Sequence, residues 1–246
     1  ADGQRVLVTR FISPELEAEI GEFAGASANL DLGRIFRLSS ANTIDGGDRA
    51  AGVPNYLAGI AISPDGRRAA IGSKQDNVFR GIIFGTGNLT HETTVRSVLS
   101  FLDLTTNAEI RHARRDFDNS DSPSAVTYTP LGDMLLVTLQ GNNRVVGIDA
   151  LGITPISTDN TVGSTLTSPA VITFDLSTGL APQGVLLDPL NHRLFTQDFM
   201  SRSVTTRNAA PLLAENRTTL PLLATTSTVD TQLLAAAVLL GTQDFY

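Results

Sequence analysis

The chain of 246 residues contains no cysteine. This absence excludes disulfides, thiolate nucleophiles, cysteine-ligated zinc, iron-sulfur clusters and covalent haem attachment within the chain. Histidine is also scarce, because only His91, His112 and His192 occur and they are far apart in the sequence. A histidine metal site would therefore have to be assembled entirely by the fold.

Long apolar runs and clustered charge are lacking as well. The longest apolar run, 233–240, has eight residues, whereas a membrane-spanning helix needs about 20. Charged residues make up 17% of the chain, the net charge is -7, and most basic residues are scattered singly. Because a polyanion is bound by a basic patch, we do not expect nucleic acid as a partner.

What the sequence does contain is short β-type runs separated by turn residues. Glycine occurs 21 times and proline 11 times, while valine, isoleucine, threonine and leucine recur in short bursts. This composition is typical of a turn-rich β protein, and the length is sufficient for one large all-β domain.

Three segments repeat one pattern, in which an apolar run, a proline-containing turn and a second apolar run follow one another. They are residues 53–72, 122–138 and 181–197, with turns at Pro64-Asp65-Gly66, Pro130-Leu131-Gly132 and Pro189-Leu190-Asn191. Proline presets the turn, and glycine or asparagine tolerates a positive φ near its end, so each segment predicts an antiparallel hairpin. Another β-type run follows each hairpin, at 95–104, 144–149 and 203–207, and residues 2–9 repeat the second half of the hairpin.

Repeats of three or four antiparallel strands with one turn chemistry are typical of β-propeller blades. We therefore predict an all-β fold with about four blades or part-blades of a β-propeller. The partial propeller is expected over residues 1–228 and a short helical segment over 229–246, with the helix itself at 229–241. Insertions at 78–94 and 151–169 are expected to form loops on one rim.

The segment 62–71 (ISPDGRRAAI), with its two weaker copies, resembles the YVTN-type repeats of seven-bladed propellers from bacterial extracytoplasmic proteins. Residues 73–81 and 233–246 are similar to segments of large propeller proteins that continue into a c-type cytochrome domain related to the di-haem peroxidase and MauG group. The resemblance implies a periplasmic or cell-surface location in a bacterium. It also implies a haem c domain in a longer parent, with an electron-transfer or peroxidase-like role, although no haem ligand can be assigned in this chain.

Four partial blades cannot close a ring, because closure is how a propeller removes its sheet edges. We therefore expect either a longer polypeptide or other chains to complete the ring. A protein partner or an adjoining domain follows from this expectation.

Polar turns follow the second strand of each repeat and would cluster on one face of the ring. We expect this face to bind a ligand or a protein partner. Its residues are Lys74, Gln75, Asp76, Asn77, Gln140, Asn142, Asn143, Arg144, Gln197 and Asp198. The alternative is that Asn, Asp and Gly occur there because tight hairpins need residues that tolerate a positive φ.

Asp116, Asp118 and Asp121 supply three carboxylates that could hold a calcium ion. The segment lacks the glycine and the distal glutamate of an EF-hand loop, which favours a solvated polar connection instead. The basic cluster at 111–115 precedes it directly, and we expect the two to pair on the protein surface.

The sequence contains no nucleophile elbow, P-loop, zinc-protease helix or dinucleotide fingerprint. We therefore predict a non-catalytic extracytoplasmic module that presents a binding face to another domain or subunit. One alternative is a propeller enzyme, of the lactonase or quinoprotein-dehydrogenase type, with a metal or cofactor at the channel and Asp76, Asn77, Asn142 and Asn143 as recurring candidates. Another alternative is a structural subunit of a larger surface or membrane-associated assembly.

Overall fold

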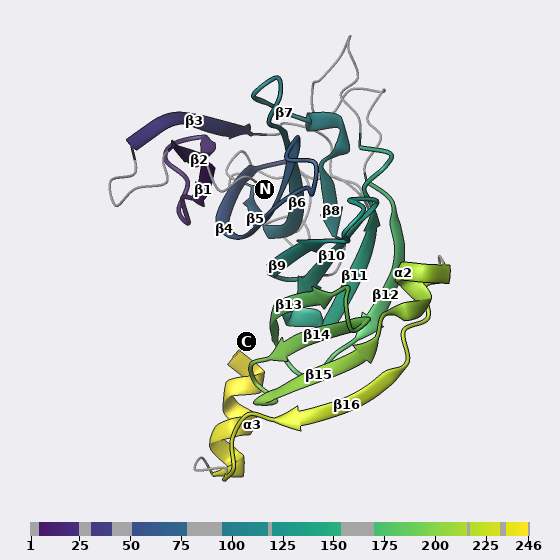
Figure 1. The fold of residues 1–246 in the computed structure, drawn as a ribbon. Helices are drawn as coiled ribbons and strands as arrows, with labels where there is room; N and C mark the ends of the chain where they lie inside the picture. The colour runs from purple at the N-terminus through teal and green to yellow at the C-terminus, as the bar shows by residue number, and fades with distance from the viewer. Residues whose placement is uncertain are drawn as a thin grey trace.

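A computed structural model describes residues 5–24, 31–40, 51–77, 95–117, 120–153, 170–215, 217–231 and 235–245. Within these residues the chain forms four antiparallel sheets that follow one another along an arc (Figure 1). The predicted insertion at 78–94, and most of the one at 151–169, lies outside the described residues. In the described part of the chain, no helix is long and apolar enough to cross a membrane.

The sheets are numbered here in chain order. Sheet 1 contains β1 (Arg5–Thr9), β2 (Glu17–Ala24) and β3 (Asp31–Ser39). Sheet 2 contains β4 (Val53–Ile62), β5 (Arg68–Asp76), β6 (Val95–Asp103), β7 (Ala108–Glu109) and β8 (Arg115–Phe117). Sheet 3 contains β9 (Pro123–Tyr128), β10 (Met134–Leu139), β11 (Arg144–Asp149) and β12 (Ile172–Ser177). Sheet 4 contains β13 (Pro182–Asp188), β14 (Arg193–Asp198), β15 (Ser203–Asn208) and β16 (Leu222–Ser227).

The helical elements are short. They are η1 (Arg111–Ala113), η2 (Gln140–Asn142), α2 (Ala210–Glu215) and α3 (Ala236–Phe245). The all-β fold class predicted from the repeats is therefore confirmed.

The three predicted hairpins are present as the strand pairs β4 with β5, β9 with β10, and β13 with β14. In the first two turns the positive φ falls on Gly66 and Gly132, at 71° and 72°, as the turn chemistry requires. In the third turn it falls on His192, at 51°, rather than on Asn191. The Asn191 amide donates a hydrogen bond to the Asp188 carboxylate at 2.7 Å, and the left-handed position lies one residue later than in the first two turns.

The core consists of three apolar interfaces, each between successive sheets. Ile20 and Leu38 of sheet 1 pack with Ile71 of sheet 2. Phe101 of sheet 2 belongs to the next cluster, and Leu194 of sheet 4 belongs to the third. Each sheet is therefore held mainly by its neighbours along the arc, which is how blades pack in a propeller.

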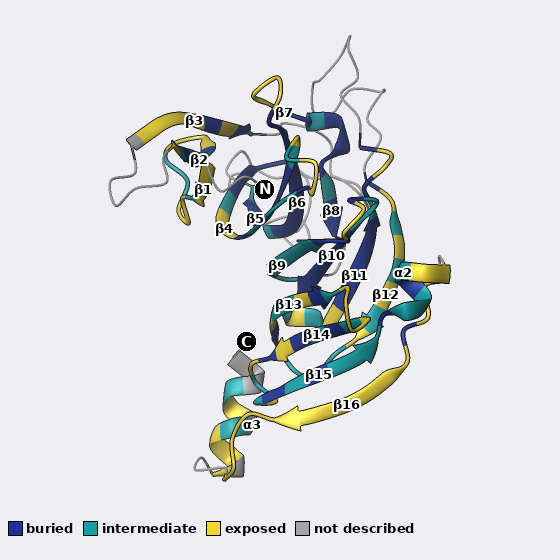
Figure 2. Cartoon of the chain, in the orientation of Figure 1, coloured by how far each residue is buried: buried dark blue, intermediate teal, exposed yellow. Residues whose placement is uncertain are grey.

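The sheets at the two ends of the arc have one uncovered face. Val8 on β1 aligns with Ile71 on β5 in the repeat, yet the former is 48% exposed and the latter is fully buried. At the other end, Leu186, on the face of β13 turned away from sheet 3, is 62% exposed, and every residue of β16 is exposed (Figure 2). The end sheets thus present apolar surface where a further sheet would pack.

The C-terminal helix differs from the prediction of a helix over 229–241. α3 begins at Ala236 and continues past Gly241 to Phe245. The Ser227 hydroxyl accepts the Val229 N–H at 3.3 Å, and a serine turn of this kind competes with helix formation. Sequence reasoning missed α2, which the Asn208 side chain caps by accepting the Ala210 N–H at 3.0 Å.

The predicted surface pairing of the basic cluster at 111–115 is wrong for Arg114, because this side chain is buried. The Arg114 side chain is 3% exposed and forms an ion pair with Glu109, which is 4% exposed. Arg114 also donates to the Ser39 carbonyl oxygen at 2.8 Å, and the Ser39 N–H donates to Glu109 at 2.9 Å. The pair therefore clamps the end of β3 to sheet 2.

Candidate functional site

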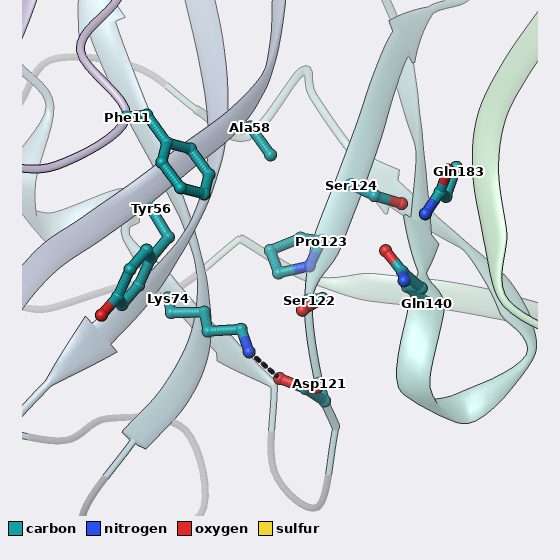
Figure 3. Close-up of a pocket in the computed structure, with 10 residues that line it drawn as sticks. All are labelled: Phe11, Tyr56, Ala58, Lys74, Asp121, Ser122, Pro123, Ser124, Gln140 and Gln183. Carbon is teal, nitrogen blue, oxygen red and sulfur yellow. Dashed lines mark ion pairs between the residues drawn. The ribbon is translucent and has the colours of Figure 1, made fainter. Parts of the chain in front are cut away.

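A cavity of about 420 Å³ opens along the inner side of the arc. The first strands of sheets 2, 3 and 4, namely β4, β9 and β13, each lie at an edge of their sheet and contact one another in series. Such inner strands line the central channel of a propeller. Side chains from β4, β9 and β13 all reach the cavity (Figure 3).

The cavity lies at the end of the channel where the polar turns gather. The turn after β10 contacts the segment that leads into β9, since the Gln140 N–H donates to the Ser122 carbonyl oxygen at 2.9 Å. The Gly141 N–H donates to the Asp121 carbonyl oxygen at 3.2 Å. These contacts bring Gln140 to the cavity wall beside Asp121, Ser122 and Pro123.

One ion pair crosses the cavity between two sheets. Lys74 of β5 approaches the Asp121 carboxylate at 3.0 Å, and each side chain is 31% exposed (Figure 3). At this exposure the pair contributes about 1 kcal/mol or less to stability. Its main consequence is chemical, because among the described residues of the lining it pairs the single carboxylate with a cation.

Two aromatic side chains form the opposite wall. The rings of Phe11 and Tyr56 meet edge to face, with 5.4 Å between their centroids, and the two residues are 57% and 38% exposed. Tyr56 has a φ of 52° and lies in a bulge of β4, a strained position of the kind that occurs at binding sites. The strand pattern of 53–62 did not indicate this bulge, so sequence reasoning missed Tyr56. It also missed Phe11, which lies in the connection between β1 and β2.

Two glutamine amides complete the polar part of the lining. Gln140 comes from the turn after β10, and Gln183 comes from β13. Neither side chain has a hydrogen-bond partner within the described part of the chain. Ser124, another residue of the lining, donates instead to the Pro182 carbonyl oxygen at 2.8 Å. The two amides can therefore donate to a ligand and accept from it.

Of the residues predicted for the polar face, the structure brings Lys74 and Gln140 together at the cavity. Gln75 is 1% exposed and accepts a hydrogen bond from Arg114 at 3.4 Å. Asp76 accepts from the Asn55 amide at 2.8 Å, and Asn77 follows it at the end of sheet 2. These three side chains are not part of the cavity lining.

The remaining predicted residues lie in or beside turns of sheets 3 and 4. Asn142 accepts the Asp121 N–H at 2.8 Å, and Asn143, with a φ of 56°, accepts the Ala181 N–H at 2.7 Å. Asn142 therefore holds the segment that enters β9, and Asn143 holds the segment that enters β13. Of the two, only Asn143 has the positive φ on which the turn alternative is based. Arg144 pairs with Asp175 at 2.5 Å.

Gln197 and Asp198 end β14 and lie outside this cavity. Gln197 is exposed, whereas Asp198 is fully buried and accepts a hydrogen bond from the Thr205 hydroxyl.

The three carboxylates considered for calcium are not brought together among the described residues. Asp116 is 2% exposed on β8, Asp121 pairs with Lys74, and Asp118 lies outside the described residues. In the described ranges no group of three metal-ligating side chains gathers. The calcium site stays a prediction.

Comparison with known proteins establishes the fold. A scan against models of protein families and a search of curated proteins each find no match. The structure is similar to the hydrazine synthase of Kuenenia stuttgartiensis, with a TM-score of 0.61 and 15% identity, over 83% of this chain and 55% of that one. It is also similar to the periplasmic gluconolactonase of Pseudomonas aeruginosa, with a TM-score of 0.54 and 11% identity, over 95% of this chain and 57% of that one.

A third similar structure is a protein of unknown function from Desulfotomaculum acetoxidans. Its TM-score is 0.53 and its identity is 13%, over 92% of this chain and 53% of that one. The chain therefore spans about half the length of the solved structures it matches. Together with the sheets and their inner strands, these matches define the class of the chain as an all-β propeller. The YVTN assignment and the cytochrome link stay predictions.

Proposed function

We propose that the chain is a non-catalytic binding module whose channel cavity takes an extended polypeptide segment from an adjoining domain or subunit. The observation that carries the proposal is the pair of glutamine amides, Gln140 and Gln183, which lie on the same side of the cavity, across from Phe11 and Tyr56 (Figure 3). A side-chain amide carries the same donor and acceptor groups as a peptide bond. Two of them can therefore hydrogen-bond successive peptide groups of a partner.

The rest of the lining supports recognition better than catalysis. The exposed faces of Phe11 and Tyr56 supply the aromatic surface that dominates binding energy at protein interfaces. Lys74 and Asp121 neutralise one another, so neither is set up to act as a general acid or base. The cavity thus offers apolar contact, amide hydrogen bonds and a fixed ion pair.

We further propose that additional sheets complete the ring, supplied by a longer polypeptide or by other chains. The uncovered faces of sheets 1 and 4 support this, since apolar surface on an end blade needs a cover. The matched structures support it as well, because each is nearly twice as long as the matched region.

An extracytoplasmic location and a c-type haem domain in the same parent belong to this proposal. The resemblance of 62–71 and 233–246 supports both, and the periplasmic gluconolactonase among the similar structures supports the location. The test is the intact mass of the protein from its native source under denaturing conditions. We expect a mass above 26.1 kDa that includes a haem-sized increment, and a mass equal to that value would contradict the proposal.

The binding proposal is tested by selecting peptides from a displayed random library on the immobilised protein. The selected peptide is then titrated against the wild type, Gln183→Ala and Phe11→Ala by fluorescence anisotropy. Each variant should weaken binding at least about tenfold, or 1.4 kcal/mol. Leu186→Ala, an exposed substitution elsewhere on β13, is the matched control. Equal affinities for all four proteins would contradict the proposal.

A lactonase is the second candidate, favoured by the similarity to the periplasmic gluconolactonase over 95% of this chain. Asp121 would then have to leave its ion pair and take part in hydrolysis at the cavity. The test is the hydrolysis of glucono-δ-lactone by the purified protein, with and without divalent cations. Turnover that exceeds the buffer rate and is abolished by Asp121→Asn would establish this candidate. An absence of turnover would favour the non-catalytic binding module.

A further inference from the structure

A second hollow, of about 500 Å³, lies between sheets 3 and 4. Its floor is the face of sheet 4 that is turned toward sheet 3, and its rim is the segment 177–179 at the end of β12. Arg207 of β15 donates to the Ser177 carbonyl oxygen at 2.7 Å. The Leu180 N–H donates to the Ser201 hydroxyl at 2.7 Å. These two bonds hold the rim over the sheet.

Oxygen-bearing side chains form two rows across the floor. Residues that face one another in an antiparallel ladder share one face of the sheet. The register gives one row of Asp198, Ser203 and Ser227 and a second row of Thr196, Thr205 and Thr225. Asp198 and Thr196 are buried and do not line the hollow, so the grid of hydroxyl groups that reaches it consists of Ser203, Thr205, Thr225 and Ser227.

Part of this grid is buried and lacks a protein partner. Ser203 lines the hollow and is 6% exposed, and its hydroxyl has no hydrogen-bond partner in the described part of the chain. One carboxylate oxygen of Asp198, which is fully buried, is likewise unpartnered among the described residues. Buried polar groups without partners are costly, so a group that satisfies them is favoured at this place.

The carboxylate also sets the direction of a neighbouring hydroxyl. Thr205 donates its hydrogen to Asp198 at 2.5 Å, which leaves the lone pairs of Thr205 to accept from a ligand in the hollow. Gly179 lets the rim close over this pair, because a Cβ at that position would lie 2.7 Å from Asp198 Oδ2. The close approach of the rim to sheet 4 at this point therefore depends on a glycine at position 179.

The charges along the hollow favour a neutral ligand. Asp198 lies at the Ser203 end, and Arg207 lies at the other end, four residues away on β15, which is about 14 Å along a strand. Asp198 would repel an anion at one end of the hollow, and Arg207 would repel a cation at the other end. A calcium ion would also require more carboxylate or carbonyl ligands than this single carboxylate supplies.

We propose that the hollow between sheets 3 and 4 binds a short neutral oligosaccharide, whose hydroxyl groups pair with Ser203, Thr205 and the neighbouring hydroxyl grid. Ligand hydroxyls donate to Thr205, and both donate to and accept from Ser203. This site is separate from the channel cavity and does not depend on the function proposed for it.

The test uses saturation-transfer NMR with maltotriose, cellotriose and chitotriose, followed by calorimetric titration of the sugar with the strongest signal. Ser203→Ala and Thr205→Val should each weaken binding about tenfold, because each removes one buried hydroxyl partner. Thr206→Val is the matched control, since Thr206 is on the same strand but on the opposite face of the sheet. Circular dichroism establishes that all three variants are folded.

Three outcomes would overturn the proposal. The first is the absence of saturation transfer from all three sugars to the wild-type protein. The second is an equal loss of affinity in Thr206→Val and Ser203→Ala. The third is a rise in melting temperature with calcium ions that Asp198→Asn removes, which would define a cation site instead.

Discussion

Two successive interfaces of this propeller use equivalent positions for opposite chemistry. Sheet 3 faces sheet 2 through Leu135, Val137, Leu139, Val146 and Ile148. The residues 59 positions later, on the face of sheet 4 turned toward sheet 3, are Leu194, Thr196, Asp198, Thr205 and Arg207. The strand registers match, since Val137 is paired with Val146 and Thr196 with Thr205.

The difference shows what packing alone requires of a blade. The interface between sheets 2 and 3 demonstrates that an apolar set fits these positions, so the oxygen-bearing side chains of sheet 4 are not needed to join two blades. Only Leu194 keeps its apolar character, and it lies in the cluster that holds sheet 4 to sheet 3. The polar positions are therefore free to line a hollow, whereas their apolar counterparts fill the core.

The largest effect is expected from Leu139→Asp. This substitution places the residue type of Asp198 at the equivalent position of the interface between sheets 2 and 3. Leu139 is 2% exposed, so the variant loses apolar contacts and buries an unpaired carboxylate. The free energy of unfolding should fall by at least about 4 kcal/mol. Urea unfolding followed by circular dichroism measures it. If this variant does not fold, Val137→Thr should still lose about 1–3 kcal/mol, and no loss in either would contradict the comparison.

The interface between sheets 1 and 2 offers a third chemistry, the buried clamp of Arg114 and Glu109. Arg114→Met should lower the free energy of unfolding by about 3 kcal/mol, because the buried Glu109 carboxylate loses its closer cation and keeps only Arg111, at 3.7 Å. Adding Glu109→Leu should restore much of the loss, since an apolar pair can replace a buried ion pair. The same urea experiment measures both, and a double variant less stable than the single one would contradict this reading.

The reverse exchange, Asp198→Leu with Thr196→Val, gives sheet 4 the residues of sheet 3. We expect the free energy of unfolding to change by no more than about 1 kcal/mol, because lost hydrogen bonds are offset by apolar burial. Oligosaccharide binding should disappear in the same protein. A loss of stability as large as that of Leu139→Asp would mean that Asp198 serves the fold rather than a ligand.

The smallest effect concerns acid stability in sheet 2. Burial by itself raises the pKa of Asp103, but hydrogen bonds from Thr106 and Thr105 outweigh it and hold this pKa below its usual value. The folded state thus binds the proton more weakly than the unfolded state. The stabilisation is present above the unfolded pKa of about 3.9 and is lost as the pH falls through the lower folded value.

Asp103→Asn should therefore be less stable than the wild type at pH 7 and should lose less stability on acidification. Urea midpoints at a series of pH values from neutral to strongly acidic measure this. The change in the free energy of unfolding should be smaller than for the variants above. Parallel plots of urea midpoint against pH for the wild type and Asp103→Asn would contradict this prediction.

The hairpins and the strands after them could be predicted from the sequence because turn chemistry is local. Gly66 and Gly132 supply the positive φ that their turns need, and the apolar runs beside them pair directly. The third turn and the start of α3 were harder to predict from the sequence, because the side chains of Asn191 and Ser227 form local hydrogen bonds that compete with the expected backbone conformation. Competition of this kind depends on individual hydrogen bonds rather than on composition.

The candidate site could be predicted only in part. Lys74 and Gln140 were found because they belong to the polar segments that recur near the ends of the second strands, although Lys74 lies within β5 rather than in a turn. Tyr56 depends on a bulge, and Gln183 depends on the approach of a neighbouring sheet. The burial of Arg114 also requires the carbonyl of Ser39, which is 75 residues away in sequence. Such long-range contacts leave no periodic signal in one sequence.

The most direct test of the channel site is amide hydrogen exchange, measured by mass spectrometry with and without the peptide selected on the wild-type protein. The account predicts slower exchange at 53–62, 121–128 and 182–188, the segments that line the cavity. Protection confined to segments away from the channel, such as β16, would contradict it.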